Sequence, residues 1–170
     1  MATNQLGPAD GTVEVHTYRE GVAQKIGHDL IIEVRDWSAT VETAADGTLA
    51  GATLEVDATS LHVREGRNGL KPLSDKDRAD IRSSIDKKIL HGKPISFRST
   101  GLDGAALTGE LTIDGTARPA SFAIELAGGR VRGTLPVTQS TFGITPYKAF
   151  MGALKVRDTV EVVLDVRLPA

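Results

Sequence analysis

The sequence predicts an all-β, mainly antiparallel fold that carries one amphipathic helix. Three observations support this class: apolar and polar residues alternate in most segments, turn residues separate these segments, and a single stretch has helical periodicity. The chain has 170 residues, which fits one domain spanning residues 1–170. Repeated strands with turns between them favour a sandwich or a barrel over a fold of alternating strands and helices.

The other strands surround the clearest hairpin, which covers residues 107–126. Apolar side chains occupy one face in both of its halves, as expected for a half-buried antiparallel pair. Asp114-Gly115 and Arg118-Pro119 mark the connection, which we expect to be a turn at the rim of the sheet. The apolar face consists of Leu107, Leu111, Ile113, Phe122, Ile124 and Leu126.

The remaining strands follow a polar N-terminal tail and have the same alternation. Strands are expected at residues 12–18, 29–34, 37–42, 49–58, 94–102, 130–140 and 159–168. The last of them is the most regular, because Val160, Val162 and Leu164 point to one side while Glu161 and Asp165 point to the other.

One helix is expected at residues 74–90. Ser74 is a suitable N-cap, acidic residues fill the first turns and lysines fill the last, as the helix dipole favours. Ile81, Ile85 and Ile89 form a narrow apolar stripe that we expect to lie on the sheet, across an opening. The segment before the helix, residues 64–73, is polar and contains glycine, which is typical of a mobile linker.

The composition excludes several classes of partner and site. The formal net charge is −2, so no overall positive field attracts nucleic acid. Cysteine is absent, which excludes disulfides and thiolate ligands for a metal. No run reaches the roughly 18 apolar residues of a transmembrane segment. The first residues lack the apolar core of a secretory signal, so we expect a cytoplasmic protein.

His28 and Asp29 are the one candidate pair for catalysis. Neighbouring strand residues point to opposite faces, so this pairing is geometrically poor and a histidine in a turn is the simpler interpretation. His16, His62 and His91 lie in separate elements without metal-ligand spacing, so no metal is expected. The chain also lacks a nucleophile elbow and a phosphate-binding glycine loop. We therefore expect no enzyme and no cofactor, with a hydrolase using His28 as the weaker alternative.

The segment of residues 142–154 is unusually apolar for a connection between strands. It holds two of the four phenylalanines and one of the two tyrosines. One interpretation is a cover over a ligand cavity, with Tyr147 and Lys148 offering polar contacts at its mouth. The other interpretation is a plug that fills one end of a barrel with core side chains.

Four short segments resemble one protein family when they are taken in order. Residues 94–99 read Pro-Ile-Ser-Phe-Arg-Ser, and residues 109–119 read Gly-Glu-Leu-Thr-Ile-Asp-Gly-Thr-Ala-Arg-Pro. Residues 142–144 read Phe-Gly-Ile, and a loop separates them from the strand Val-Arg-Asp-Thr-Val-Glu-Val at residues 156–162. This series resembles the YceI-like family of bacterial lipocalin-like, polyisoprenoid-binding proteins.

The resemblance implies an extended eight-stranded antiparallel barrel with the helix beside it and an elongated apolar tunnel inside. It also implies that the tunnel binds an isoprenoid or another long-chain lipid and that the family shares no chemical reaction. Eight inward-facing residues are expected to line the cavity: Leu54, Phe97, Ile113, Phe122, Ile124, Phe142, Phe150 and Leu164. Tyr147 and Lys148 are expected at its polar mouth.

Two further questions stay open at this point. A barrel of this size can hold one ligand or be filled by its own side chains, in which case the protein is a structural or regulatory module. The sequence does not fix the oligomeric state, and a homodimer is compatible with it.

Overall fold

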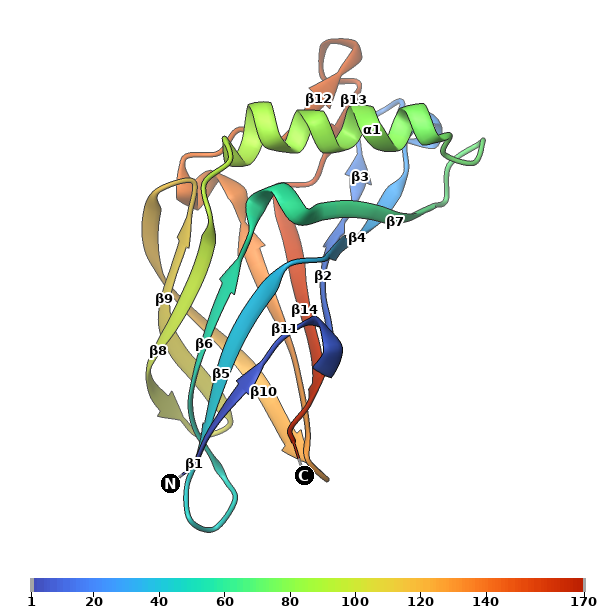
Figure 1. Cartoon of the computed structure of the whole chain (residues 1–170). Helices are drawn as coiled ribbons and strands as arrows, with labels where there is room; N and C mark the ends of the chain where they lie inside the picture. The colour runs from blue at the N-terminus through green and yellow to red at the C-terminus, as the bar shows by residue number, and fades with distance from the viewer. Residues whose placement is uncertain (1, 170) are drawn as a thin grey trace.

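The computed structural model describes residues 2–169 and shows one antiparallel sheet of eleven strands, curled into a half-barrel (Figure 1). The strands of this sheet are β1 (Ala2–Leu6), β2 (Gly11–Thr17), β4 (Asp29–Val34), β5 (Trp37–Thr43), β6 (Leu49–Val56), β7 (Leu61–Arg67), β8 (Ile95–Asp103), β9 (Ala106–Ile113), β10 (Thr116–Ala127), β11 (Arg130–Thr138) and β14 (Thr159–Arg167). Their spatial order is β1-β5-β6-β8-β9-β10-β11-β14-β2-β4-β7. The fold is therefore all-β, as predicted.

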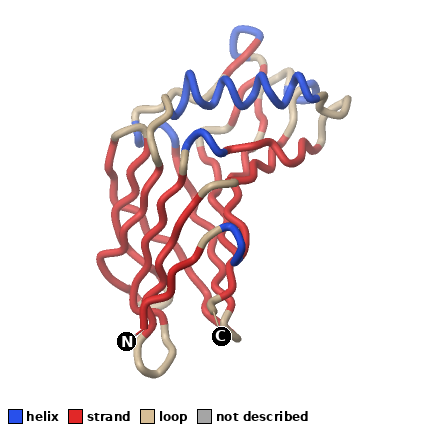
Figure 2. The backbone as a smooth tube through the Cα atoms, viewed as in Figure 1, coloured by secondary structure: helices blue, strands red, loops and turns tan. Residues whose placement is uncertain are grey.

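A second, small sheet projects from one end of the half-barrel. It consists of β12 (Lys148–Ala149), β13 (Leu154–Val156) and β3 (Arg19–Glu20), with β13 in the centre. Short 3-10 turns connect several strands, as Figure 2 shows. They cover Pro8–Asp10, Gln24–Ile26, Ala58–Ser60, Gln139–Phe142 and Phe150–Gly152.

The single long helix lies across the same end of the half-barrel, which we call the helix end; the chain termini lie at the opposite end (Figure 1). The helix begins as α1 (Asp75–Ser84) and continues as a wider π-helical segment, Ile85–Leu90. Ser74 accepts a hydrogen bond from the Asp77 amide while the Asp77 carboxylate accepts one from the Ser74 amide, which is a capping box. The helix predicted at residues 74–90 is confirmed.

The hairpin predicted around residue 114 is also confirmed, but its turn is shorter than expected. Ile113 pairs with Thr116, so only Asp114 and Gly115 form the loop, and both have the positive φ that a two-residue hairpin turn requires. Pro119 lies inside β10 rather than in a rim turn. Only residues 124–127 of β10 pair with β11, so Pro119 lies where one edge of the strand is free and a missing N–H is tolerated.

The strand count differs from the expected eight because some strands carry no visible alternation. β1 occupies the polar N-terminal tail, where no strand was expected; most of its residues are exposed, and pairing with β5 defines it as a strand. β7 lies where no strand was expected, and it takes in four residues of the predicted linker, up to Arg67, because it pairs with β4. Within residues 2–169, the edge strands β1 and β7 do not pair with each other, so the sheet stays open.

The core lies between the two curved walls of the sheet. Its most deeply buried side chains are Leu107, Val13, Val41, Val131 and Val166. The helix adds the buried Leu90, and its isoleucine stripe packs on the core in a half-buried position. The apolar stripe of the sequence therefore faces the sheet, as expected.

Candidate binding site

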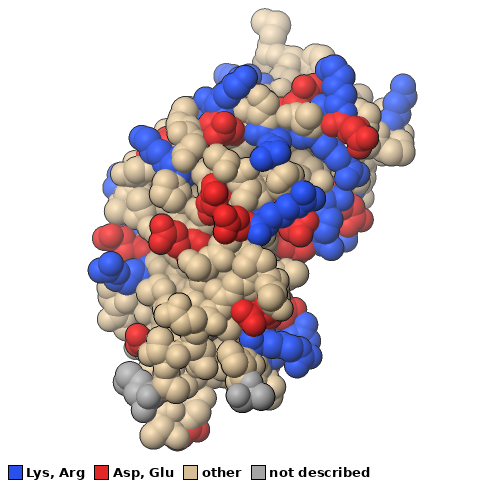
Figure 3. Space-filling view, in the orientation of Figure 1, with Lys and Arg blue, Asp and Glu red and all other residues tan. Residues whose placement is uncertain are grey.

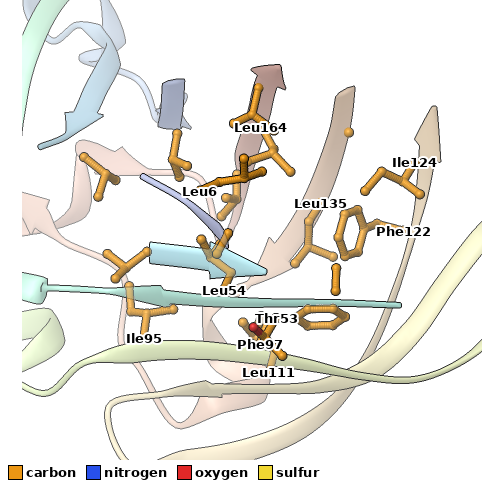
Figure 4. Close-up of a pocket in the computed structure, with 18 of the residues that line it drawn as sticks. Leu6, Thr53, Leu54, Ile95, Phe97, Leu111, Phe122, Ile124, Leu135 and Leu164 are labelled. Carbon is orange, nitrogen blue, oxygen red and sulfur yellow. The ribbon is translucent and has the colours of Figure 1, made fainter. Parts of the chain in front are cut away.

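An apolar cavity lies between the walls of the half-barrel (Figure 4). Its volume is about 60 Å³, and only apolar atoms are exposed inside it. Strands from both walls contribute to the lining, and the residues labelled in Figure 4 are Leu6, Thr53, Leu54, Ile95, Phe97, Leu111, Phe122, Ile124, Leu135 and Leu164. The site is therefore suited to hydrocarbon and offers nothing to a charged group.

Strand alternation explains why the lining is apolar. In β6, Ala52, Leu54 and Val56 point inward, while the intervening Thr53 and Glu55 side chains are exposed. The Thr53 hydroxyl lies 2.6 Å from that of Thr40 on the outer face of the sheet. In β14, Val162, Leu164 and Val166 line the cavity in the same way.

Two phenyl rings form the centre of one wall, and two glycines make room for them. The rings of Phe97 and Phe122 meet edge to face, with centroids 5.2 Å apart and an interplanar angle of 72°. A Cβ atom at Gly109 would lie 2.8 Å from the Phe97 ring, and one at Gly133 would lie 3.2 Å from the Phe122 ring. The glycines and the rings are thus complementary in size.

The structure places the predicted residues in three groups. Half of them, Leu54, Phe97, Phe122, Ile124 and Leu164, line the cavity. Ile113 and Phe142 are buried but belong to the core outside the cavity lining. Tyr147, Lys148 and Phe150 lie on the surface, and Phe150 is 65% exposed.

The expectation that Phe150 faces inward was therefore wrong, and the predicted mouth does not adjoin the cavity. The segment of residues 142–154 divides in two: Phe142 and Ile144 are buried and plug the core, whereas the later part forms the projecting β12–β13 hairpin. Phe150 sits at the tip of that hairpin with a φ of 52°, and its side chain is exposed. The cover and the plug were each expected to describe the whole segment, but only its first part plugs the core and its second part projects from the sheet.

Several lining residues were not predicted. Leu6, in the tail taken as polar, reaches the cavity because β1 pairs with β5 in a register that places it beside Ala39. Its signal was a lone leucine in a polar segment, which is too weak to identify a strand. Gly133 lines the cavity without a side chain, and no pattern of apolar residues can reveal such a position.

His28 acts as a brace between segments and is not paired with Asp29. Its Nε2 atom lies 2.5 Å from the Lys71 carbonyl oxygen, and its ring packs on Gly69. The Asp29 carboxylate accepts hydrogen bonds from the Arg19 amide and the Asn68 side chain. This geometry matches the interpretation of a structural histidine in a turn.

No group of three or more His, Asp or Glu side chains within residues 2–169 is arranged to hold a metal ion. None of the helices in this part of the chain has the length and apolar character needed to cross a membrane.

Two hydrogen-bonded pairs join β14 to its surroundings at opposite ends. At the helix end, the Tyr18 hydroxyl donates to the Glu161 carboxylate, and this bond together with burial raises the pKa of Tyr18. At the other end, Arg130 holds Asp165 through two hydrogen bonds, of 2.7 and 2.5 Å, which lower the pKa of Asp165. Both contacts keep β14 in place beside the cavity.

Comparisons with known proteins agree with this architecture. BcnA of Burkholderia cenocepacia, a crystal structure, superposes with a TM-score of 0.63 at 18% identity, covering 94% of this chain and 96% of that one. The YCEI protein of Campylobacter jejuni superposes with a TM-score of 0.58 at 12% identity, covering 82% of this chain and 84% of that one. At these identities the likeness concerns the fold alone.

A search of curated proteins finds no match. The model of the YceI-like domain, in contrast, matches residues 8–168, which is nearly the whole chain. The chain therefore belongs to the YceI-like family.

Proposed function

We propose that this chain binds a long apolar chain, an isoprenoid or another lipid, between the walls of the half-barrel and catalyses no reaction on it. The observation that carries the proposal is the cavity whose lining comes from both walls and exposes only apolar atoms. Each Å² of apolar ligand surface that is buried there contributes about 25 cal/mol to the free energy of binding. Membership of the YceI-like family, whose proteins are described as polyisoprenoid-binding, supports the same ligand class.

The volume of the cavity implies that the walls move when such a ligand binds. Pockets for small molecules usually measure about 300–1,000 Å³, whereas this cavity measures about 60 Å³. Leu54, Phe122 and Leu164 are only half-buried, so these side chains have room to turn. The free edge of β10 at residues 116–123 and the unpaired edge strands are places where the sheet can widen.

The same small volume favours a second candidate, a structural or regulatory module whose core is closed. Native mass spectrometry of delipidated protein with farnesol and with longer prenyl alcohols separates the two. The proposal expects one prenyl chain per protein, retained in preference to short alcohols. If the spectra show only ligand-free protein with every prenyl alcohol tested, the closed module is supported instead.

A variant that fills the cavity locates the ligand. Ala52 lines the cavity, and Ala52→Leu replaces its methyl group by an isobutyl group that competes for the same space. Ala123→Leu is the matched control, because Ala123 lies on β10 with its side chain exposed. We expect Ala52→Leu to lower the affinity for the prenyl chain about tenfold or more, because the larger side chain displaces a few methylene groups of the ligand from the cavity. Equal uptake by both variants would place the ligand elsewhere.

We propose a bracing role for His28 in place of a catalytic one. Its hydrogen bond to the Lys71 carbonyl ties β4 to the segment before the helix. His28→Ala should lower the free energy of unfolding by about 1–2 kcal/mol, since a hydrogen bond and packing on glycine are lost. It should leave prenyl uptake unchanged. A hydrolytic activity in the native protein that disappears in this variant at unchanged stability would contradict the role.

A further inference from the structure

The exposed apolar side chains of this protein are concentrated at the helix end. Of the large hydrophobic residues that are exposed among residues 2–169, only Leu102 lies at the opposite end. The others are Val22, Ile26, Leu70, Tyr147, Phe150 and Met151. Val22 and Met151 are the most exposed of them, and Val22 is 95% exposed. An uneven distribution of this kind indicates an interaction surface.

Two of these side chains occupy a single projecting tip. Phe150 and Met151 connect β12 to β13, and both have positive φ, of 52° and 57°. That conformation costs about 1–2 kcal/mol per residue unless the residue is glycine. Phe150 and Met151 therefore hold strained, exposed positions where glycine would be the stable choice, which points to a function for their side chains.

Backbone hydrogen bonds attach the tip to neighbouring segments of the chain. The Ala23 amide donates to the Ala153 carbonyl over 2.7 Å, which places Val22 beside the returning strand of the hairpin. The Arg157 amide donates to the Tyr18 carbonyl over 2.7 Å at the base of the small sheet. Phe150 and Met151 thus lie at the end of a protrusion with Val22 close to its returning chain, and Figure 3 shows an uncharged knob at this end of the molecule.

The base of the protrusion is positively charged although the chain as a whole is not. Residues 18–27 and 147–157 carry five basic side chains and one acidic one, a net charge of +4, whereas the whole chain has −2. The basic residues are Arg19, Lys25, Lys148, Lys155 and Arg157, and the acidic one is Glu20. Within residues 2–169, Lys25, Lys148 and Arg157 form no ion pair. Lys88 of the helix adds a further charge beside Tyr147, 5.4 Å from its ring.

We infer that the protrusion docks on an anionic lipid membrane, with Val22, Phe150 and Met151 inserted between head groups and the lysines above them. Apolar side chains combined with basic residues are the pattern of peripheral membrane binding. A convex tip of three side chains is too small for a stable protein interface, which buries about 800 Å² per partner. The inference does not depend on a ligand in the cavity, because the tip lies outside it.

Vesicle co-sedimentation of the full chain tests the inference. Wild-type protein should bind phosphatidylcholine vesicles that contain phosphatidylglycerol, bind less at high salt, and bind pure phosphatidylcholine vesicles weakly. The double variant Phe150→Gly with Met151→Gly should reduce binding to anionic vesicles about tenfold or more. Loss of a single large apolar side chain from the membrane already accounts for an effect of this size. The same double variant should be at least as thermally stable as wild type, because glycine relieves the strain.

Leu102→Ser is the control, since it removes an exposed leucine at the opposite end and should leave vesicle binding unchanged. The inference fails if the wild type ignores anionic vesicles, or if the glycine variant binds them as well as wild type does. It also fails if sedimentation velocity shows that the glycine variant converts a dimer to a monomer while vesicle binding is absent. In that case the tip is a contact between two copies.

Discussion

Gly109 shows how closely the wall of the half-barrel is packed at the level of single residues. A Cβ atom there would lie 2.2 Å from the Arg98 carbonyl oxygen and 2.8 Å from the Phe97 ring, and the backbone atom cannot move aside. We predict that Gly109→Ala lowers the free energy of unfolding by about 1–3 kcal/mol. Gly101→Ala is the matched control, because its new Cβ would meet only Thr108 at an ordinary 3.5 Å. Equal denaturation midpoints for the two variants would refute this packing.

The pair of Asp165 and Arg130 makes stability depend on pH. Because the folded state lowers the pKa of Asp165, the pair stabilises the protein above the unfolded pKa of about 3.9 and stops doing so as the pH falls through the folded value. Asp165→Asn should therefore cost about 0.5–1 kcal/mol at neutral pH, as expected for a partly exposed pair, and nothing in strong acid.

Denaturant unfolding across this pH range measures the difference. Asp103→Asn serves as the control, because Asp103 is exposed and forms no ion pair within residues 2–169. A gap between Asp165→Asn and wild type that is constant from neutral to acid pH would show that the charge on Asp165 is not the cause.

At the scale of elements, the helix depends on its N-terminal cap, on a contact near its middle and on one at its C-terminal end. Arg82 donates to the Thr59 carbonyl over 2.8 Å, and His91 lies 3.0 Å from the Asp114 carboxylate in the β9–β10 turn. We predict that Ser74→Ala lowers the free energy of unfolding by about 1 kcal/mol and speeds amide exchange in the first helical turns. Ser83→Ala, within the helix, should be neutral or slightly stabilising. Unchanged exchange in Ser74→Ala would contradict the capping box.

Most elements with a buried face could be predicted from the sequence, and those without one could not. β7 is the exception, because Leu61 and Val63 are buried but no strand was expected there. β4, at Asp29–Val34, has the predicted bounds because its apolar residues are buried in the sheet. β1 has one buried residue, Leu6, and exists because the backbone of β5 offers it hydrogen bonds, which no side-chain pattern reveals. In the small sheet, β3 depends in the same way on its pairing with β13, more than a hundred positions away along the chain.

At the scale of the whole molecule, the candidate site could be predicted only in part. Leu54 and Phe122 belong to alternating strands, so their inward direction follows from the pattern. Phe150 was misplaced because composition shows that a segment is apolar but not whether it folds inward or outward. The pairing of β12 with β13 places Phe150 at the tip of a projecting hairpin, and composition does not reveal this pairing.

The central claim is that hydrocarbon enters the space between the two walls, and methyl NMR of the labelled protein tests it most directly. On titration with a prenyl alcohol, the methyl signals of Leu54 and Leu164 should shift and show contacts to the ligand. The methyl signals of Leu102, exposed at the far end of the molecule, should stay in place. Unshifted Leu54 and Leu164 signals at saturating prenyl alcohol would contradict the account and leave a closed core.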